Sequence, residues 1–407
     1  MTTSAPLGCW PSPAQMPGLG FLVAKSELAQ LAGSVAALPR TFRLPEDYVA
    51  WQELLSSKEG AGTQWVQKSA AHRGVHIIPD PAAPELRQLQ GVLAQQLVRP
   101  HLIGGRAWDV ELYVAITQLE PLTAYVFSTS VLLRFCSKPY QRDITPDTDT
   151  STYVIDGLSD FTPGFEVDAM RPHYDDAYAD TDLGSSMNLA ALRSQLAAQG
   201  VNTTKWWLDV QAAVVQTLQA VAPKMEAQRK GRYPDALVNL FTLVRFDFML
   251  DEHGSSKLLE VTLSPRLHRP DKDINHQLMH RKLVHDLISL KGLARDGRAN
   301  QHIARTLSPL KYHMDTTCQR IDCLRQECTL CKICKSLWHL VLLTNLQAEH
   351  NHAHGFMRVH PLHRALTQHM EESGMDWRAY FDAETRPDNV VIKMWLDRKC
   401  EQDFRWC

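Results

Sequence analysis

Residues 240–263 constrain the fold more than any other part of the sequence. Their letters, LFTLVRFDFMLDEHGSSKLLEVTL, place two apolar segments on either side of the polar run at residues 251–256. Two apolar segments of strand length joined by a short polar run with a glycine are typical of a β-hairpin, because glycine readily adopts the positive φ that tight turns require. The sequence therefore predicts two antiparallel strands here.

The register of this hairpin brings two carboxylates together. A two-residue turn at His253-Gly254 pairs the following positions: Glu252 with Ser255, Asp247 with Glu260, and Arg245 with Thr262. Directly opposed residues have Cβ atoms ~5 Å apart, so like charges repel unless a cation neutralises them. Because Mg²⁺ takes carboxylate oxygens and leaves room for nucleotide phosphates, we expect Asp247 and Glu260 to bind it. The alternative is a solvated strand face or salt bridges with Arg245.

The pattern of apolar residues predicts a mixture of helices and strands up to about residue 297. Helical spacing occurs at residues 26–37, 46–57, 188–198 and 204–222, with Asn202 or Thr203 as the cap of the last helix. Alternating or continuous apolar residues predict strands at residues 110–118, 123–128 and 131–136. Residues 140–185 are rich in Asp, Thr and Pro and are expected to form a long loop.

Composition excludes several classes of protein. The 43 Lys and Arg nearly balance the 45 Asp and Glu, so no overall field favours nucleic acid or anionic lipid. The longest apolar stretch, residues 337–346, is shorter than the ~20 residues that cross a bilayer. Residues 1–15 carry no recognisable targeting signal and are expected to be a flexible segment. We therefore expect no nucleic-acid partner, no membrane span and, by default, a cytoplasmic location.

The C-terminal part of the chain differs in composition from the rest. After about residue 298 it is rich in Cys and His, which predicts a separate region at residues 298–407. Its closely spaced cysteines are Cys318, Cys323, Cys328, Cys331 and Cys334, with His339, His350, His352 and His354 further along. Thiolates at such spacing suit a structural Zn²⁺. Free thiols are the main alternative, since disulfides need an oxidising compartment.

Several segments resemble the tubulin tyrosine ligase-like family, in the family's order. They are Met16-Pro17-Gly18 with FLVAKSEL (21–28), PRTFRLPEDY (39–48), WVQKSAAHRGVHII (65–78), GRAWDVELYV (105–114), RFCSKPY (134–140), the helical residues 188–218, and RFDFMLDEHGSSKLLEVTLSP (245–265). The resemblance is to the tubulin polyglutamylase type and covers residues 16–297. The family normally has a further subdomain before the Pro-Gly segment, so we expect the sequence to lack it.

The resemblance implies a fold, a reaction and a location. The fold is α/β (α+β): an ATP-grasp fold that binds nucleotide between two β-sheet subdomains, here with a Cys/His-rich C-terminal extension. The reaction uses ATP and Mg²⁺ to attach an amino acid to glutamate side chains of tubulin tails through an acyl phosphate. Glutamate is the expected donor, and glycine or tyrosine are the alternatives. The implied partners are tubulin or microtubules and a free amino acid, and the implied location is the cytoskeleton, including the cilium or basal body.

The resemblance also assigns roles to individual residues. The implied catalytic residues are Lys25 and Arg134. The implied nucleotide-binding residues are Lys68, Arg73, Gly74, Gln95, Asp109 and Arg134. The implied magnesium ligands are Asp247, Glu260 and Thr262.

Several positions depart from the family pattern. Ala107 replaces a usual Lys, Glu111 replaces a usual Arg, Gln96 replaces a usual basic residue, and Thr262 replaces a usual Asn. Because Ala107 and Glu111 remove positive charge beside the phosphate site, they motivate an alternative function. In this alternative, the protein is a catalytically impaired family member that binds microtubules or nucleotide.

Overall fold

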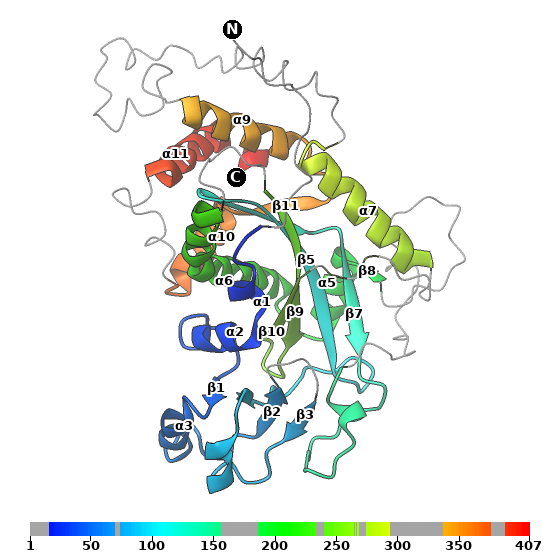
Figure 1. Cartoon of the computed structure of the whole chain (residues 1–407). Helices are drawn as coiled ribbons and strands as arrows, with labels where there is room; N and C mark the ends of the chain where they lie inside the picture. Colours follow the sequence, from blue (N-terminus) through cyan, green and yellow to red (C-terminus); the bar gives the residue numbers. More distant parts are fainter. Residues whose placement is uncertain are drawn as a thin grey trace.

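The computed structural model describes residues 16–69, 74–155, 186–232, 240–263, 265, 267, 274–293, 337–375 and 387–407. Within these ranges the chain forms two antiparallel β-sheets (Figure 1). A four-stranded sheet lies at the bottom of the view and a seven-stranded sheet lies above it. The mixed α/β class expected from the sequence is therefore confirmed.

The small sheet is built around two tryptophans. Its strand order is β1-β4-β2-β3, with β1 Thr41–Leu44, β4 Val92–Gln96, β2 Trp65–Ser69 and β3 Val75–Ile77. Helix α3, Tyr48–Leu55, packs on it through Trp51, whose ring lies edge-on to that of Trp65 at 5.5 Å between centroids. Both rings are fully buried, and the short 3₁₀ helix η1, Pro84–Gln88, adds Leu86 to the same cluster.

The large sheet is organised around its longest strand, β5. The main order is β10-β9-β5-β6-β11, and β7 and β8 continue from the other end of β5. The strands are β5 Trp108–Leu119, β6 Leu122–Phe127, β7 Ser130–Phe135, β8 Ser186–Asn188, β9 Thr242–Leu250, β10 Ser256–Leu263 and β11 Phe356–His360. Every pair in the sheet is antiparallel.

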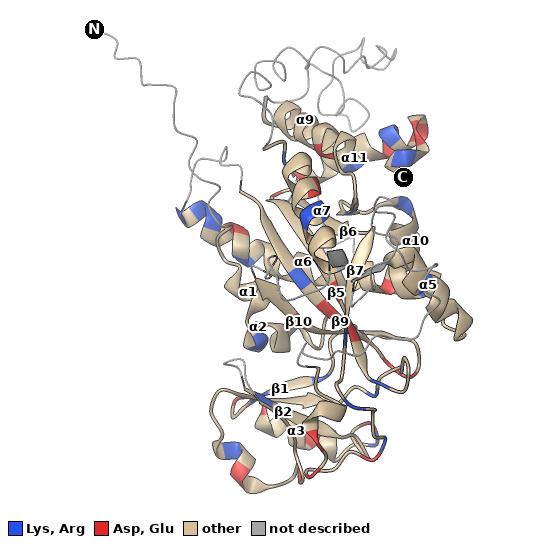
Figure 2. Ribbon diagram, turned by 90° about the vertical axis from the view of Figure 1, so that its right-hand side faces the viewer, with Lys and Arg blue, Asp and Glu red and all other residues tan. Residues whose placement is uncertain are grey.

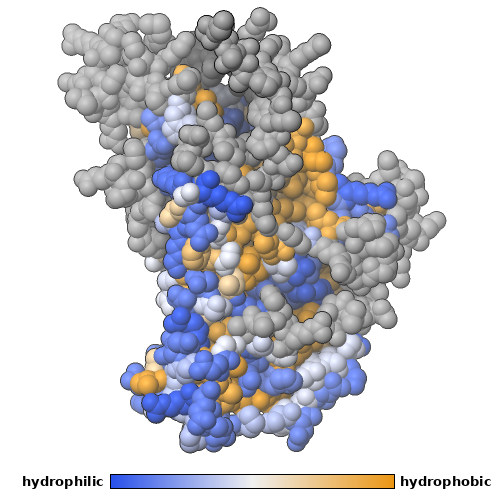
Figure 3. Space-filling model, viewed as in Figure 1, coloured by the Kyte–Doolittle hydropathy of each residue, from blue (hydrophilic) through white to orange (hydrophobic). Residues whose placement is uncertain are grey.

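Helices cover both faces of the large sheet. On one face, the main core joins the sheet to α1 Gly20–Val23, α2 Lys25–Leu31, α5 Leu189–Ala198, α6 Thr203–Arg232 and α10 Arg364–Glu372. On the other face, α7, Ile274–Leu290, packs on a second cluster that includes Tyr113, Phe127 and Phe356. Apolar side chains gather over the large sheet beside α7 (Figure 3). None of the helices in the described ranges has the length and apolar character that a bilayer span needs.

Most expected helices and strands are present, but two helices end at unexpected residues. The helix expected at 26–37 ends at Leu31, because the next residues include Gly33, a poor helix former, and form turns. The helix expected at 204–222 continues past Pro223 to Arg232. Burial of Met225 in the main core stabilises this extension, since it outweighs the one hydrogen bond that proline removes. The side chain of Asn202 accepts a hydrogen bond from the N–H of Lys205 at 3.0 Å, which confirms it as a cap.

The described C-terminal residues pack against the rest of the protein. Strand β11 pairs with β6, and Val359 of β11 lies in the main core with Leu366 and Met370 of α10. Helices α9, Leu337–Asn351, and α11, Pro387–Gln402, form their own cluster at the top of Figure 1. A strand that follows residue 298 is thus part of the same sheet as the hairpin.

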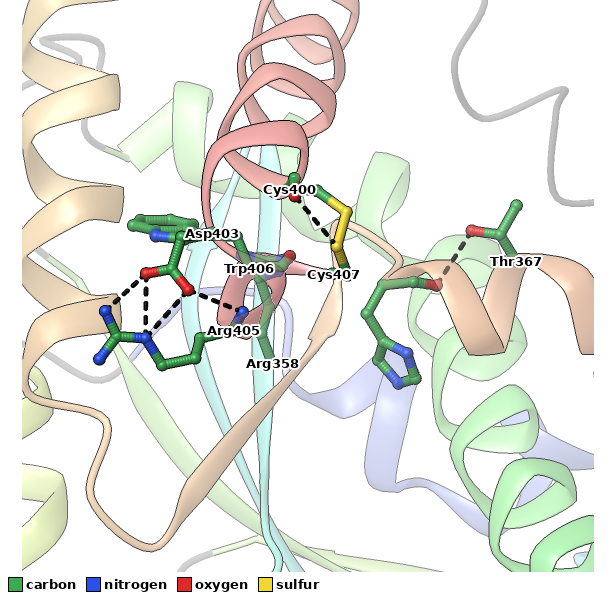
Figure 4. Close-up of a disulfide and its surroundings, with 8 residues drawn as sticks. Arg358, Thr367, Cys400, Asp403, Arg405, Trp406 and Cys407 are labelled. Carbon is green, nitrogen blue, oxygen red and sulfur yellow. Dashed lines mark hydrogen bonds and ion pairs between the residues drawn. A yellow bond between two sulfur atoms is a disulfide. The ribbon is translucent and has the colours of Figure 1, made fainter.

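A disulfide fastens the last described residues to α11. Cys400 and Cys407 are joined across the 3₁₀ helix η8, Phe404–Trp406 (Figure 4). The ring of Trp406 stacks on that of His350 at 3.5 Å between centroids, and Arg358 donates a hydrogen bond to the Trp406 carbonyl at 2.9 Å. No role for these two cysteines was expected from the sequence.

Two histidines, the buried His360 and the half-buried His363, connect β11 and the start of α10 to neighbouring elements. The contacts are His360 Nδ1 to the Leu122 carbonyl at 2.7 Å, His360 Nε2 to the Gln219 amide at 3.2 Å, His363 Nε2 to Gln211 Oε1 at 2.8 Å, and the Leu366 N–H to His363 Nδ1 at 3.3 Å. In each ring one nitrogen donates and the other accepts, which is the pattern of a neutral imidazole. Burial lowers the pKa of both His360 and His363 to about 4.

We expect these histidines to make the protein less stable in mild acid. Their folded pKa lies below the unfolded value near 6.5, so the unfolded chain binds protons first as the pH falls. Stability present above pH 6.5 is then lost toward pH 4, by about 2 kcal/mol per ring at pH 5. The double variant His360→Asn, His363→Gln should show a smaller fall in unfolding temperature between pH 7.5 and 5 than the wild type.

The control for this measurement is His253→Asn, because the His253 side chain is 80% exposed. Its unfolding temperature should follow the wild-type pH dependence. If the double variant also lost stability as steeply as the wild type, these two rings would not be the cause.

Candidate functional site

A cavity of about 180 Å³ lies where the small sheet faces the large one. Its lining comes from both sheets and from the loops beside them: Lys25, Val66, Lys68, Ser69, Gly74, Val75, Gln95, Gln96, Leu97, Val98, Asp109, Arg134, Tyr153, Val154, Ile155, Asp247, Met249, Leu259 and Glu260. Acidic positions of β5 and β9 gather at the end of the large sheet that faces the small sheet (Figure 2). The cavity therefore has charged walls supplied by segments far apart in the sequence.

The hairpin places Asp247 and Glu260 opposite one another, as predicted, but its turn differs from the predicted one. The turn is a three-residue loop, because the N–H of Asp251 bonds to the Ser255 carbonyl at 2.9 Å and Gly254 has a φ of 78°. The predicted pairing of Glu252 with Ser255 is therefore wrong. A β-bulge between Leu258 and Glu260 then shifts the register by one residue and restores the predicted pairs of Asp247 with Glu260 and Arg245 with Thr262.

The two carboxylates lie in different surroundings. The Asp247 side chain is 2% exposed, whereas that of Glu260 is 34% exposed. Lys25 Nζ, from the first turn of α2, lies 3.6 Å from Glu260 Oε1. Glu260 therefore faces the open side of the cavity, and Asp247 forms its floor.

Asp247 belongs to a buried network of charges on β5, β7 and β9. Arg134 binds Asp109 with two hydrogen bonds of 2.9 and 2.5 Å and Asp247 with one of 2.9 Å. Arg245 binds Asp247 with two hydrogen bonds of 2.7 and 2.8 Å. Glu111 Oε1 lies between the two guanidinium groups, 3.1 Å from Arg134 and 2.9 Å from Arg245. The network thus contains three acidic and two basic side chains.

Burial and charge act in opposite directions on the pKa values in this network. Burial raises the pKa of Glu111 to about 7, although Arg134 and Arg245 oppose the shift. Burial likewise raises the pKa of Asp109 against the effect of Arg134. Burial disfavours the charge of Arg134, but the surrounding carboxylates raise its pKa well above its usual value. Burial also disfavours the charge of Arg245, but Asp247 and Glu111 raise its pKa, so both guanidinium groups stay charged.

Most residues that the sequence analysis selected line the cavity together. These are Lys25, Lys68, Gly74, Gln95, Asp109, Arg134, Asp247 and Glu260. Thr262 does not line it, and its hydroxyl lies 3.5 Å from Arg245 Nη2. Arg73 and the five clustered cysteines lie outside the described residues, so their roles as nucleotide and zinc ligands stay predictions.

Several cavity residues were not expected from the sequence. Leu97, Val98 and Tyr153 line the cavity, although no motif identified them. Leu97 and Val98 directly follow β4, so the end of that apolar strand was an available signal. Tyr153 follows a polar segment whose path no local pattern predicts.

The acidic residues of the cavity suit a hard divalent cation. Two carboxylates on neighbouring strands provide the oxygen ligands that Mg²⁺ prefers, and Mg²⁺ usually keeps waters or phosphates as its other ligands. Within the described ranges, no group of three or more His, Cys, Asp or Glu side chains is placed to hold a metal by itself. Waters or the oxygens of a bound phosphate would complete the coordination of such a cation.

Comparison with known proteins identifies related sequences. Residues 21–297 match the sequence profile described as the tubulin-tyrosine ligase family. A probable tubulin polyglutamylase, ttll-15 of Caenorhabditis elegans, is 24% identical over 96% of this chain and 72% of its own length. The tubulin polyglutamylase ttll6 of Danio rerio is 24% identical over 66% of this chain. The human tubulin monoglutamylase TTLL4 is 29% identical over 62% of it. The matches span 35% of the zebrafish relative and 20% of the human one.

Proposed function

The chain belongs to the tubulin-tyrosine ligase family, and from this membership we propose that it is an ATP-dependent ligase that modifies tubulin. In this proposal it attaches an amino acid, most readily glutamate, to glutamate side chains of tubulin tails. The relatives named tubulin polyglutamylase and monoglutamylase support glutamate as the donor, with glycine or tyrosine as alternatives. Because the proposed substrate is tubulin, the protein is expected to associate with the cytoskeleton.

The observation that carries the proposal is the meeting of basic and acidic side chains in one cavity. Lys68 of the small sheet and Arg134 of the large sheet line it from opposite sides, together with Asp247 and Glu260. Phosphoryl transfer between anions requires positive charge directed at the phosphate oxygens, and preorganised charge is the main catalytic contribution in this class. A nucleotide bound between the two sheets would place its phosphates among these groups.

The proposed reaction has two steps. First, a carboxylate oxygen of the acceptor glutamate attacks the γ-phosphorus of ATP, and the bond to the bridging oxygen breaks so that ADP leaves. Second, the amine of the donor amino acid attacks the resulting acyl phosphate, the carbon–oxygen bond breaks, and inorganic phosphate leaves while the amine loses a proton. ATP is required because forming an amide from a carboxylate and an amine is uphill in water.

The protein's own side chains have separate tasks in this scheme. Lys68 and Arg134 stabilise the negative charge of the phosphates, and Lys25 neutralises Glu260 or an incoming carboxylate. Asp247 and Glu260 would hold Mg²⁺, which would neutralise phosphate charge during transfer. Gln95, whose amide donates to Thr41 Oγ1 at 2.9 Å, is held in place at the cavity wall.

Radiolabel incorporation into microtubules tests the proposal. The purified protein is incubated with microtubules, ATP and Mg²⁺, and with labelled glutamate, glycine or tyrosine in separate reactions. We expect label from glutamate, with none when ATP or Mg²⁺ is omitted. Absence of label with every donor would refute the ligase.

The second candidate function, binding without turnover, is favoured by the position of Glu111. Its carboxylate contacts Arg134 and Arg245, so it reduces the positive charge that Arg134 offers to phosphate. Ala107 supplies no charge in compensation. If no label is incorporated, stabilisation by ATP in a thermal unfolding assay would support a nucleotide-binding protein without ligase activity.

We expect nucleotide affinity to fall as the pH rises above about 8. Burial, together with the nearby charge of Lys25, lowers the pKa of Lys68 to about 8, so the free protein loses this positive charge above that pH. A phosphate bound beside Lys68 favours the protonated form, so binding near pH 9 should take up a proton. Calorimetry in buffers of different ionisation enthalpy measures this uptake. In Lys68→Met the uptake should disappear, and uptake unchanged by this substitution would contradict the assignment.

A further inference from the structure

Arg245 binds the side chain of Asp247, the carboxylate that the proposed function assigns as a ligand of the cation. Its Nε lies 2.7 Å from Asp247 Oδ1 and its Nη2 lies 2.8 Å from Asp247 Oδ2. A guanidinium that bonds to both oxygens of a carboxylate forms one of the strongest ion-pair geometries in proteins. A divalent cation at Asp247 must therefore compete with Arg245 for the same oxygens.

Arg134 also contacts Asp247, but it is less suited than Arg245 to leave that carboxylate when a cation binds. It contacts Asp247 through one hydrogen bond and is held by two to Asp109, and it lines the cavity where phosphate is proposed to bind. Arg245 does not line the cavity. Displacement of Arg245 away from the cavity would leave the phosphate-binding wall intact.

Glu111 provides an alternative partner for Arg245. Its side chain is 6% exposed, and its Oε1 already lies 2.9 Å from Arg245 Nη1. The Thr262 hydroxyl lies on the same side, 3.5 Å from Arg245 Nη2. The Arg245 side chain is only 17% exposed, so losing Asp247 would be costly without another partner, and Glu111 supplies a carboxylate already in contact.

We propose that Arg245 and Glu111 together set the affinity of the site for a divalent cation. Arg245 holds the Asp247 carboxylate while no cation is bound, and Glu111 retains the guanidinium when a cation takes Asp247. This inference rests on the proposed function, because it takes Asp247 as a ligand of the cation. It gives Glu111 a positioning role that is distinct from reducing the charge at the phosphate site.

Mn²⁺ binding in the presence of ADP tests the inference without relying on activity. Free Mn²⁺ is measured by electron paramagnetic resonance while the protein is titrated. Arg245→Gln removes the competing cation and should bind Mn²⁺ roughly tenfold more tightly, since neighbours of metal ligands change affinity by about 10- to 100-fold. Glu111→Gln removes the alternative partner and should bind Mn²⁺ more weakly by a similar factor.

Two further variants separate local competition from net charge. The double variant Glu111→Gln, Arg245→Gln has the formal charge of the wild type and should still bind Mn²⁺ more tightly than the wild type. Lys257→Gln removes one positive charge from the same hairpin, but Lys257 lines a different pocket. The Mn²⁺ affinity of this variant should therefore stay at the wild-type value. Arg245→Lys, whose single ammonium cannot bond to Asp247 in the same two-pronged way, should bind Mn²⁺ more tightly by a smaller factor.

The outcomes distinguish this inference from the proposed function. Wild-type binding together with unchanged affinity in Arg245→Gln and Arg245→Lys would overturn the inference and leave the proposed site standing. Wild-type affinity in the double variant would overturn it as well, because net charge alone would then explain the gain. Mn²⁺ binding that is seen only after Arg245 is replaced would support the inference. Absence of Mn²⁺ binding in the wild type and every variant would refute both the inference and the proposed cation site.

Discussion

Glu260→Gln is expected to reduce ligation at least a hundredfold while leaving the fold intact. The substitution keeps the size of the side chain but removes the negative charge that the proposed site offers to Mg²⁺. Because the Glu260 side chain is 34% exposed and forms a 3.6 Å ion pair with Lys25, the cost in stability should be small. Initial rates of glutamate incorporation, measured over a range of Mg²⁺ concentrations, give the size of the effect.

Glu252→Gln is the matched control for this prediction. It makes the same chemical change on the same hairpin, at a side chain that is 35% exposed and lies 3.8 Å from Arg99. Glu252 lines pockets other than the proposed active site, so its incorporation rate should match the wild type. Equal losses in the two variants would mean that the hairpin's general charge, and not a ligand at Glu260, is responsible.

The hairpin illustrates how much of the site could be predicted from sequence. Its strands and the pairing of Asp247 with Glu260 follow from apolar segments around a glycine-containing turn. The turn itself has one residue more than expected, and a bulge at Leu259 compensates for it. Local sequence does not determine a bulge, because its stability depends on how the bulged strand packs in the sheet.

The charge network shows what local patterns leave out. Position 111 was expected to weaken phosphate binding, because Glu111 replaces a usual Arg of the family two residues beyond Asp109. The contact of Glu111 with Arg245 depends on the pairing of β5 with β9, which are separated by more than 100 residues in the chain. Such long-range pairings carry little local signal, so the contact of Glu111 with Arg245 could be found only in the folded structure. The salt bridge of Arg245 with Asp247, two residues apart on β9, was one of the alternatives that the sequence left open.

Phe356→Ala is expected to destabilise the whole domain by about 3–5 kcal/mol, the usual cost of removing a buried aromatic ring. Phe356 begins β11, is 3% exposed, and its ring lies 5.3 Å from that of Phe127 on the neighbouring strand β6. The same cluster includes Tyr113 of β5 and residues of α7, so a cavity there affects the sheet that carries the proposed site.

Chemical denaturation measures the prediction, and Phe404→Ala is its control because Phe404 is 82% exposed. The control should stay within about 0.5 kcal/mol of the wild type, as surface substitutions usually do. If β11 were merely an appendage, Phe356→Ala would leave the main unfolding transition unchanged, and binding of nucleotide would be unaffected. A shift of that main transition, together with weaker nucleotide binding near its midpoint, would instead mean that the residues after 337 support the sheet on which Asp109, Arg134 and Asp247 are placed.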